Sequence, residues 1–304
     1  MLSVDFINVG YGDAIFIRDC EADFSMLVDC GDVTIGDGGT PSSRISAADF
    51  LQKNDVHMLD LLVLTHLHRD HSGGLTEVLH TVQVREFWSN YLPPQKFWGR
   101  HAVVPAQASA GARCLLESMN ILLDALSELQ KQGTAIRLMQ PDSMTLCFTK
   151  DLKAEICSEE KILHEQQTEI WKHVLEGSGT GEELDHLDQF INNTSIRMRL
   201  SFHGKTVELP GDIYADCWEK HRLSPCTIVK LPHHGHRDSI TTRLLDMLRP
   251  QHVVISVSNS RKDDCPAEAV LRELEARPCT LHITDAVCAN GRTPHYHPSV
   301  HFTL

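Results

Sequence analysis

Long apolar runs are absent from this 304-residue sequence, and no stretch approaches the length that a membrane-spanning helix needs. A signal peptide is lacking as well, since Met1 to Phe6 is already strand-like and carries no basic region. No internal repeat is visible. We therefore expect a cytoplasmic protein that does not act in a membrane.

Paired cysteines are also missing. The ten cysteines are scattered along the chain, none beside another and none at C-x-x-C spacing. This pattern argues against a cysteine-ligated zinc site. It indicates reduced cysteines, most of them in the core of a cytoplasmic protein.

Basic residues are too few to balance the acidic ones. The chain has 28 Lys and Arg against 41 Asp and Glu, a formal charge of −13. General nucleic-acid binders carry a basic surface, so this charge argues against that class. The hydrophobic fraction of 41% supports a sizeable core, and the length permits one large domain or two small ones. We expect one domain over residues 1–304, while the oligomeric state is not indicated.

Histidine, in contrast, is abundant, with nineteen residues that cluster in a few short stretches. The densest stretch is Thr65–Gly74, and it follows the apolar run 61–64, which is typical of a buried strand. Imidazole and carboxylate groups are ligands of zinc and related divalent ions. The stretch therefore predicts a metal site, and the alternative is a polar loop that happens to be rich in histidine.

The spacing within this stretch indicates how two ions could be held. Residues two apart point the same way where a strand opens into a loop, so His66 and His68 can close on one ion. Asp70 and His71 come after the backbone has turned, and they can reach a second ion beside the first.

The rest of the chain predicts alternating strands and helices. A helix at 43–52 would have Ser42 or Ser43 as its N-cap. The other expected helices are 75–80, 213–221, 240–248 and 266–275, and the expected strands are 4–9, 14–17, 24–28, 82–88, 195–202, 206–209, 226–231, 253–257 and 281–283.

Residues 90–190 depart from this core pattern, and we expect them to be an insertion packed over the site as a lid that shapes substrate access. The alternative is a plain structural elaboration. The clearest element of this range is a helix at 113–132, whose single apolar stripe should be buried against the core or a partner subunit. The other expected elements are strands at 144–148 and 152–157, a polar helix at 159–176 and a mobile loop at 177–188.

Four stretches together carry a resemblance to a known family. They are 8–14 (Asn-Val-Gly-Tyr-Gly-Asp-Ala), 27–31 (Leu-Val-Asp-Cys-Gly), 66–71 (His-Leu-His-Arg-Asp-His) and 229–235 (Val-Lys-Leu-Pro-His-His-Gly). In this order they resemble the metallo-β-lactamase superfamily, and most of all the ComEC-type competence-protein domain and its stand-alone relatives. The resemblance implies an α/β fold, an αββα four-layer sandwich with a largely helical insertion. Its metal site would lie between the edges of two sheets.

The resemblance also implies ligands outside the histidine motif. Asp212 would bridge two ions, and Asp29 would orient a ligand histidine from behind. Asn193 occupies a position where histidine is usual, and its amide oxygen suits harder ions such as manganese better than zinc. His186 or His203 could substitute for it.

The second histidine stretch is expected to supply one ligand and one catalytic group. We assign His234 as the ligand and His233 as the substrate or proton-transfer residue, with the opposite assignment left open. Lys230, His236 and Arg237 are nearby cations that could meet an anionic substrate, and the alternative for each is an ordinary surface side chain.

Together these features predict a metal-dependent hydrolase with two divalent ions, zinc or manganese. The resemblance implies a small-molecule or phosphodiester substrate. The first site would be His66, His68, Asp212 and Asn193, and the second Asp70, His71, Asp212 and His234. The ions would lower the pKa of a bridging water, giving a hydroxide that attacks a phosphodiester, with Asp70 and His233 as catalytic residues. The rivals are hydrolysis of a thioester, lactone or amide, a non-catalytic ligand-binding role, and a nuclease acting on single strands.

Overall fold

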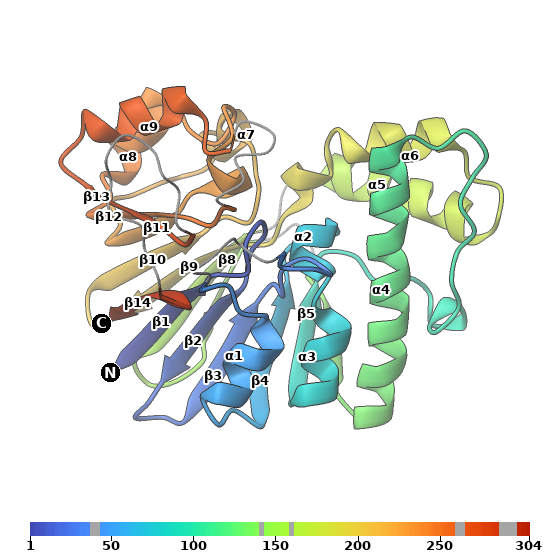
Figure 1. Cartoon of the computed structure of the whole chain (residues 1–304), viewed down its shortest axis with the longest axis horizontal. Helices are drawn as coiled ribbons and strands as arrows, with labels where there is room; N and C mark the ends of the chain where they lie inside the picture. The colour runs from blue at the N-terminus through green and yellow to red at the C-terminus, as the bar shows by residue number, and fades with distance from the viewer. Residues whose placement is uncertain (37–42, 140–142, 158–160, 259–264, 286–296) are drawn as a thin grey trace.

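The computed structural model describes the chain except for residues 37–42, 140–142, 158–160, 259–264 and 286–296. Within the described ranges the strands form two seven-stranded sheets, with helices over both outer faces (Figure 1). This arrangement confirms the expected αββα sandwich.

The first sheet has the strand order β14-β1-β2-β3-β4-β5-β6. Its strands are β1 (Leu2–Ile7), β2 (Ile15–Asp19), β3 (Phe24–Val28), β4 (Met58–Leu64), β5 (Gln83–Ser89), β6 (Ala135–Leu138) and β14 (Ser299–Thr303). The pairing is antiparallel from β14 to β3 and parallel from β3 to β6. The carboxyl ends of β3 and β4 therefore meet at one edge of this sheet.

The second sheet has the order β13-β12-β11-β10-β9-β8-β7. Its strands are β7 (Met144–Cys147), β8 (Leu152–Cys157), β9 (Arg197–Phe202), β10 (Lys205–Leu209), β11 (Ile228–Lys230), β12 (His252–Ile255) and β13 (Thr280–Ile283). The pairing is antiparallel from β7 to β10 and parallel from β10 to β13. The carboxyl ends of β10 and β11 thus share an edge too.

The helices cover the outer faces in two groups (Figure 1). One group lies on or beside the first sheet: α1 (Ala47–Lys53), α2 (Arg69–Ser72), α3 (Leu75–Thr81), α4 (Ala110–Gln132), α5 (Lys161–Leu175) and α6 (Gly181–Asp188). The other lies on the second sheet: α7 (Ala215–Trp218), α8 (Thr242–Leu248) and α9 (Glu268–Glu275). Three 3-10 turns complete the described elements: η1 (Gln95–Phe97), η2 (Ile191–Thr194) and η3 (Pro232–Gly235). No helix in the described part of the chain is both long and apolar enough to cross a membrane.

Helix α4 forms as its apolar spacing predicts. Its buried face includes Leu115, Met119, Leu122 and Leu126, which pack with the hydrophobic cluster of the first sheet. The apolar stripe of α4 is therefore buried against the core, which was one of the two places expected for it, the other being a partner subunit. The helix begins after the N-cap Ser109, whose side chain accepts from Ala112 N.

Two local predictions are wrong. The first helix is capped by Ser46, which accepts from Asp49 N, while the Ser43 hydroxyl accepts from Asn8 Nδ2 and Ser42 lies outside the described residues. The expected mobile loop at 177–188 is in large part helix α6.

Helix α6 owes its start to a capping box at Thr180. The Thr180 hydroxyl accepts from Glu183 N, and the Glu183 carboxylate accepts from Thr180 N. Such a box satisfies two backbone donors that the first turn leaves open. The acidic composition of this stretch suggested a solvated loop, but the spacing of Thr180 and Glu183 was the stronger signal.

Residues 90–190 also contribute to both sheets. Strand β6 was not expected, and it pairs in parallel with β5, while β8 pairs with β9 of the second sheet. The strands of this range therefore belong to the two core sheets, and its helices and connecting segments make up the departure from the core pattern. Whether those helices act as a lid stays a prediction.

Thr180→Ala should destabilise α6 by about 1 kcal/mol, because the first-turn donor of Glu183 loses its acceptor. Hydrogen exchange of residues 181–188 measures this as faster exchange in the variant. Ser178→Ala is the matched control, since the Ser178 hydroxyl donates only to His173 O outside the box. Unprotected amides at 181–188 in the unaltered protein would show that the loop prediction was right after all.

Candidate metal centre

The predicted ligands come together where the carboxyl ends of four strands meet. Asp29 follows β3, the histidine motif follows β4, Asp212 follows β10, and the pair at 233–234 follows β11. The sheets are tied at this edge by Ile196 N, which donates to Thr65 O at 2.9 Å. Ligand sites of α/β proteins gather at such strand ends.

Two glycines let the backbone pass close to this centre. Gly12 has φ 128°, and a Cβ there would lie 2.3 Å from Asp70 O. Gly211 has φ 62°, and a Cβ there would lie 2.7 Å from Ser195 Cβ. Both positions exclude a larger residue on steric grounds as well as by conformation.

The candidate metal-binding cluster has four side chains: Asp70, His71, Asp212 and His234. One potential ligand atom of each lies within 4.8 Å of the others. His71 Nε2 lies 3.1 Å from Asp212 Oδ2. His234 Nε2 lies 3.2 Å from the same oxygen and 2.9 Å from Asp70 Oδ2. All but Asp70 are almost fully buried. Two imidazole nitrogens and two carboxylates converging on one point are the donor set of a divalent ion.

The other ring nitrogens of these histidines are already occupied. His71 Nδ1 donates to Asp29 Oδ2 at 2.8 Å, and His234 Nδ1 donates to Ser256 O at 2.9 Å. Each bond orients a ring so that Nε2 faces the cluster. Asp29 thus has the position that the resemblance implied.

The charge balance also fits a cation. Burial opposes protonation of His234, but the charge of Asp212 and hydrogen bonds to Asp212 and Asp70 outweigh it, raising the pKa of His234 to about 10. Burial likewise opposes protonation of His71, yet Asp212, Asp29 and Asp70 hold its pKa well above the usual value. The carboxylates therefore favour positive charge at the point where a divalent ion would supply it.

His66 and His68 form a second pair beside this cluster. His66 Nε2 and His68 Nδ1 lie 3.2 Å apart, and the rings of His66 and His71 are 4.2 Å apart. Burial holds the pKa of His66 well below its usual value, so the ring is neutral and can offer a lone pair. The two nitrogens can face one ion, as the spacing predicts.

Asn193 lies near the centre, but its oxygen already has a partner. Asn193 Oδ1 accepts from Tyr214 N at 3.0 Å, which fixes the backbone after Asp212. Its role as a ligand stays a prediction. The possible substitutes lie elsewhere: His203 is 61% exposed in a hairpin turn, and His186 packs on the Phe190 ring.

A carboxylate from the helical layer reaches the centre instead. Asp188, the last residue of α6, has Oδ1 3.2 Å from His68 Nε2. Its Oδ2 lies 2.6 Å from where a Cβ of Gly111 would stand. Sequence reasoning missed this residue because it treated residues 177–188 as a loop. The capping box at Thr180 was the signal that could have found it.

Lys230 is not the substrate-facing cation that we expected. Its side chain is 1% exposed, and Nζ donates to Asp212 Oδ1 at 3.0 Å while also contacting Asp13. The residue ends the buried strand β11, so its ammonium points into the protein. Asp13, which belongs to the stretch 8–14, is its second partner.

His233 and His236 lie at the rim with Asp238. His233 Nδ1 is 2.7 Å from Asp238 Oδ1, His236 Nδ1 is 3.2 Å from it, and the two rings are 4.9 Å apart. His233 N donates to Asp212 Oδ1, whereas the ring of His234 belongs to the buried cluster. This placement agrees with the assignment of His234 as ligand and His233 as the outer residue.

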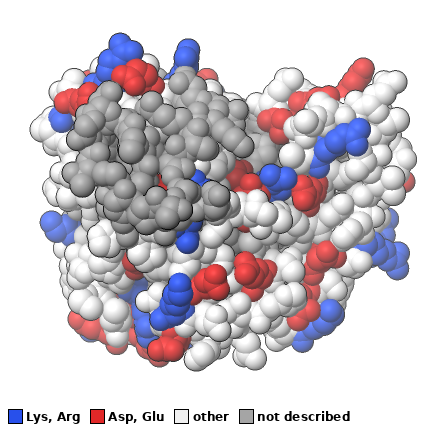
Figure 2. Space-filling view, viewed as in Figure 1, with Lys and Arg blue, Asp and Glu red and all other residues white. Residues whose placement is uncertain are grey.

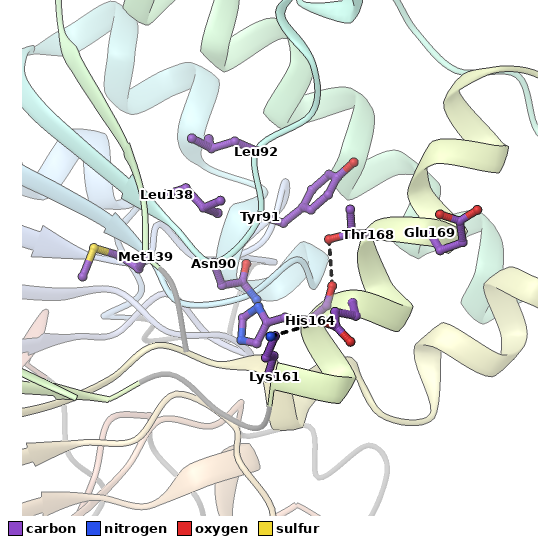
Figure 3. A pocket seen from close by; sticks show the side chains of 10 residues that line it. Asn90, Tyr91, Leu92, Leu138, Met139, Lys161, His164, Thr168 and Glu169 are labelled. Atoms are coloured by element: carbon purple, nitrogen blue, oxygen red, sulfur yellow. Dashed lines mark hydrogen bonds and ion pairs between the residues drawn. The ribbon is translucent and has the colours of Figure 1, made fainter. Parts of the chain in front are cut away.

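A cavity in the described part of the chain lies apart from the metal cluster. It measures about 790 Å³ and is lined by residues after β5, by Leu138 and Met139, and by one face of α5 (Figure 3). Asn90 at its floor donates to Thr194 O and Oγ1 next to Asn193. None of the predicted ligands lines this cavity.

The described part of the face drawn in Figure 2 carries acidic and basic side chains in alternation, without a continuous basic area. This distribution is in keeping with the formal charge of −13.

The family model of the metallo-beta-lactamase superfamily matches residues 7–258. The chain belongs to this superfamily. No curated protein matches the sequence. Its membership of the ComEC-type subfamily stays a prediction.

Two solved structures show the same fold. The metallo-beta-lactamase fold protein YhfI from Bacillus subtilis is 12% identical with a TM-score of 0.52, over 93% of this chain and 96% of that one. Zn(2+)-bound PqqB from Methylobacterium extorquens is 11% identical with a TM-score of 0.50, over the full length of both chains.

Asp212→Asn should release at least one divalent ion per chain, because Asp212 Oδ2 lies within reach of both buried Nε2 atoms. Metal content after stripping and reloading measures this, independently of activity. The control is Asp216→Asn, an exposed carboxylate in α7. Equal metal content in both variants would remove Asp212 from the ligand set.

Proposed function

We propose that this superfamily member is a metal-dependent phosphodiesterase. The observation that carries the proposal is the buried group Asp70, His71, Asp212 and His234, with the His66–His68 pair beside it. Two divalent ions, zinc or manganese, held there would act as Lewis acids. They would lower the pKa of a bound water molecule, so that hydroxide is available at neutral pH.

Asp70 would face the substrate from within the group. It is the most exposed of the four, with 18% of its side chain accessible. Burial opposes its ionisation, but His71 and His234 outweigh that effect and lower the pKa of Asp70. The carboxylate therefore stays ionised and can orient a water molecule at the opening.

His233 is suited to donate a proton to the leaving oxygen. Asp238 accepts from His233 Nδ1 at 2.7 Å and orients the ring, which leaves Nε2 for the substrate. The Tyr214 ring lies 5.5 Å from the His233 ring and limits its movement. His236 adds a second imidazole at the same rim, where a phosphodiester anion would lie.

Hydrolysis of a thioester, lactone or amide would use the same buried group. The rim favours the phosphodiester, because the imidazoles of His233 and His236 lie side by side there and can donate hydrogen bonds to the oxygens of an anion. A non-catalytic role would rest on the separate 790 Å³ cavity, which needs no metal.

Metal-loaded protein should hydrolyse bis-p-nitrophenyl phosphate faster than p-nitrophenyl ester, thioester, lactone or lactam substrates. The measurement compares kcat/KM across this panel with Mn²⁺ and with Zn²⁺. Preference for a carbonyl substrate would overturn the phosphodiester assignment. Absence of bound metal together with no turnover would favour the non-catalytic role.

His233→Gln should lower kcat by about 10²-fold for a methyl phenyl phosphodiester and far less for the p-nitrophenyl analogue, whose leaving group needs no proton. His236→Gln, at the same rim, is the matched control and should not show this dependence on the leaving group. Equal losses on both substrates in His233→Gln would mean that the ring binds substrate without transferring a proton.

A further inference from the structure

A second polar cavity lies on the outer face of the second sheet. It measures about 270 Å³ and lies among β7, β8, β9 and the segment after α7. Cys157 at the end of β8 lines it and is paired in register with Arg197 of β9. None of the predicted metal ligands lines this cavity.

Cys157 is surrounded by groups that stabilise a thiolate. Its Sγ lies 2.7 Å from Ser143 Oγ. A hydrogen bond with His221, assisted by Ser143 and Arg197 and opposed by burial, lowers the pKa of the Cys157 thiol to about 7. The side chain is partly exposed, so a reagent in the cavity can reach the sulfur.

Arg197 gives the cavity an unsatisfied donor. Arg197 is 8% exposed, and its Nη1 has no hydrogen-bond partner among the described residues. The neighbouring Arg199 is different, because its guanidinium donates to Glu208, Ser224 O and Pro225 O. A buried donor without an acceptor is costly, and a bound anion would supply the acceptor.

The charge around the cavity favours an anion too. The charged side chains that line it are Arg197, Arg199, Arg222, Glu155 and Glu208, with His221 beside them. Cations therefore outnumber anions here, although the chain as a whole carries a formal charge of −13.

We propose that Cys157 is a modification site for small anionic disulfides, with Arg197 and His221 holding the reagent and the thiol in place. The Cys157 Sγ attacks one sulfur of the disulfide, the S–S bond breaks, and a new bond forms between Sγ and that sulfur. The other half leaves as a thiolate and takes up the proton that Cys157 gave to His221. Cys157 is oxidised to a mixed disulfide, and the released thiol is the reduced product.

The test is the reaction of the full chain with glutathione disulfide, which carries a net negative charge, and with cystamine, which is cationic. Peptide mass spectrometry follows each cysteine with time at pH 7. The internal control is Cys147, an exposed cysteine on the adjacent strand β7.

Ionisation alone should make Cys157 react about threefold faster than an exposed thiol of ordinary pKa. About half of its thiol is ionised at pH 7 against a few per cent of an ordinary one, and lower basicity cancels part of that gain. Anion binding should raise the ratio further with glutathione disulfide but not with cystamine.

Arg197→Gln should lower the rate at Cys157 with glutathione disulfide and leave the rate at Cys147 unchanged. His221→Gln, at a partly exposed position, provides a second variant and should slow both reagents at Cys157. Equal rates at Cys157 and Cys147 would overturn the proposal, as would a preference of Cys157 for cystamine.

Discussion

The buried ammonium of Lys230 is the contact on which the arrangement of the metal centre depends. It lies between Asp13 and Asp212, and all three side chains are almost fully buried. Breaking such an ion pair on one side costs roughly 3–5 kcal/mol, because the remaining charge has no compensation. Lys230 and the backbone N–H of His233 together occupy Asp212 Oδ1, so Oδ2 faces the two buried imidazoles.

Asp29 performs the matching task on the first sheet. Its Oδ1 accepts from Thr65 N, and its Oδ2 accepts from Thr65 Oγ1 and from His71 Nδ1. One carboxylate thereby fixes both the start of the histidine loop and the tilt of a ring within it. Each sheet contributes a buried acid at a strand end, and the two acids hold the ligand groups from opposite sides.

Polar contacts of Asp188 and Arg69 join the helical layer to this centre. Asp188 contacts His68, and Arg69 donates to Asp32 and to Glu117 of α4. Helix α6 is held in turn by its capping box and by His173, which pairs with Glu183. A shift of α6 would therefore move Asp188 relative to His68 and change the hydrogen bond between them. The predicted lid would act on the site through this contact.

The strand before the histidine motif and helix α4 were decided by the sequence alone. The apolar run before His66 specified a buried strand, and the spacing of the motif placed His66 and His68 on one side of its end. The 3.6-residue stripe of α4 specified both the helix and its buried face. These features depend on neighbours within a few residues, and the resemblance to a superfamily supplied their order in the fold.

Other features were decided only by tertiary structure. Asp188 meets His68 across 120 positions in the chain, and β14 joins β1 from the far end. Lys230 was expected to face a substrate, but its side chain is buried between Asp13 and Asp212. The sequence pattern of a strand does not show which side chains of other strands and loops lie opposite a given residue. The sequence likewise did not show that Asn193 Oδ1 accepts a hydrogen bond from Tyr214 N, because the two residues meet only in the folded chain. Local periodicity sets which face a residue occupies, but its partner is set by how distant elements pack.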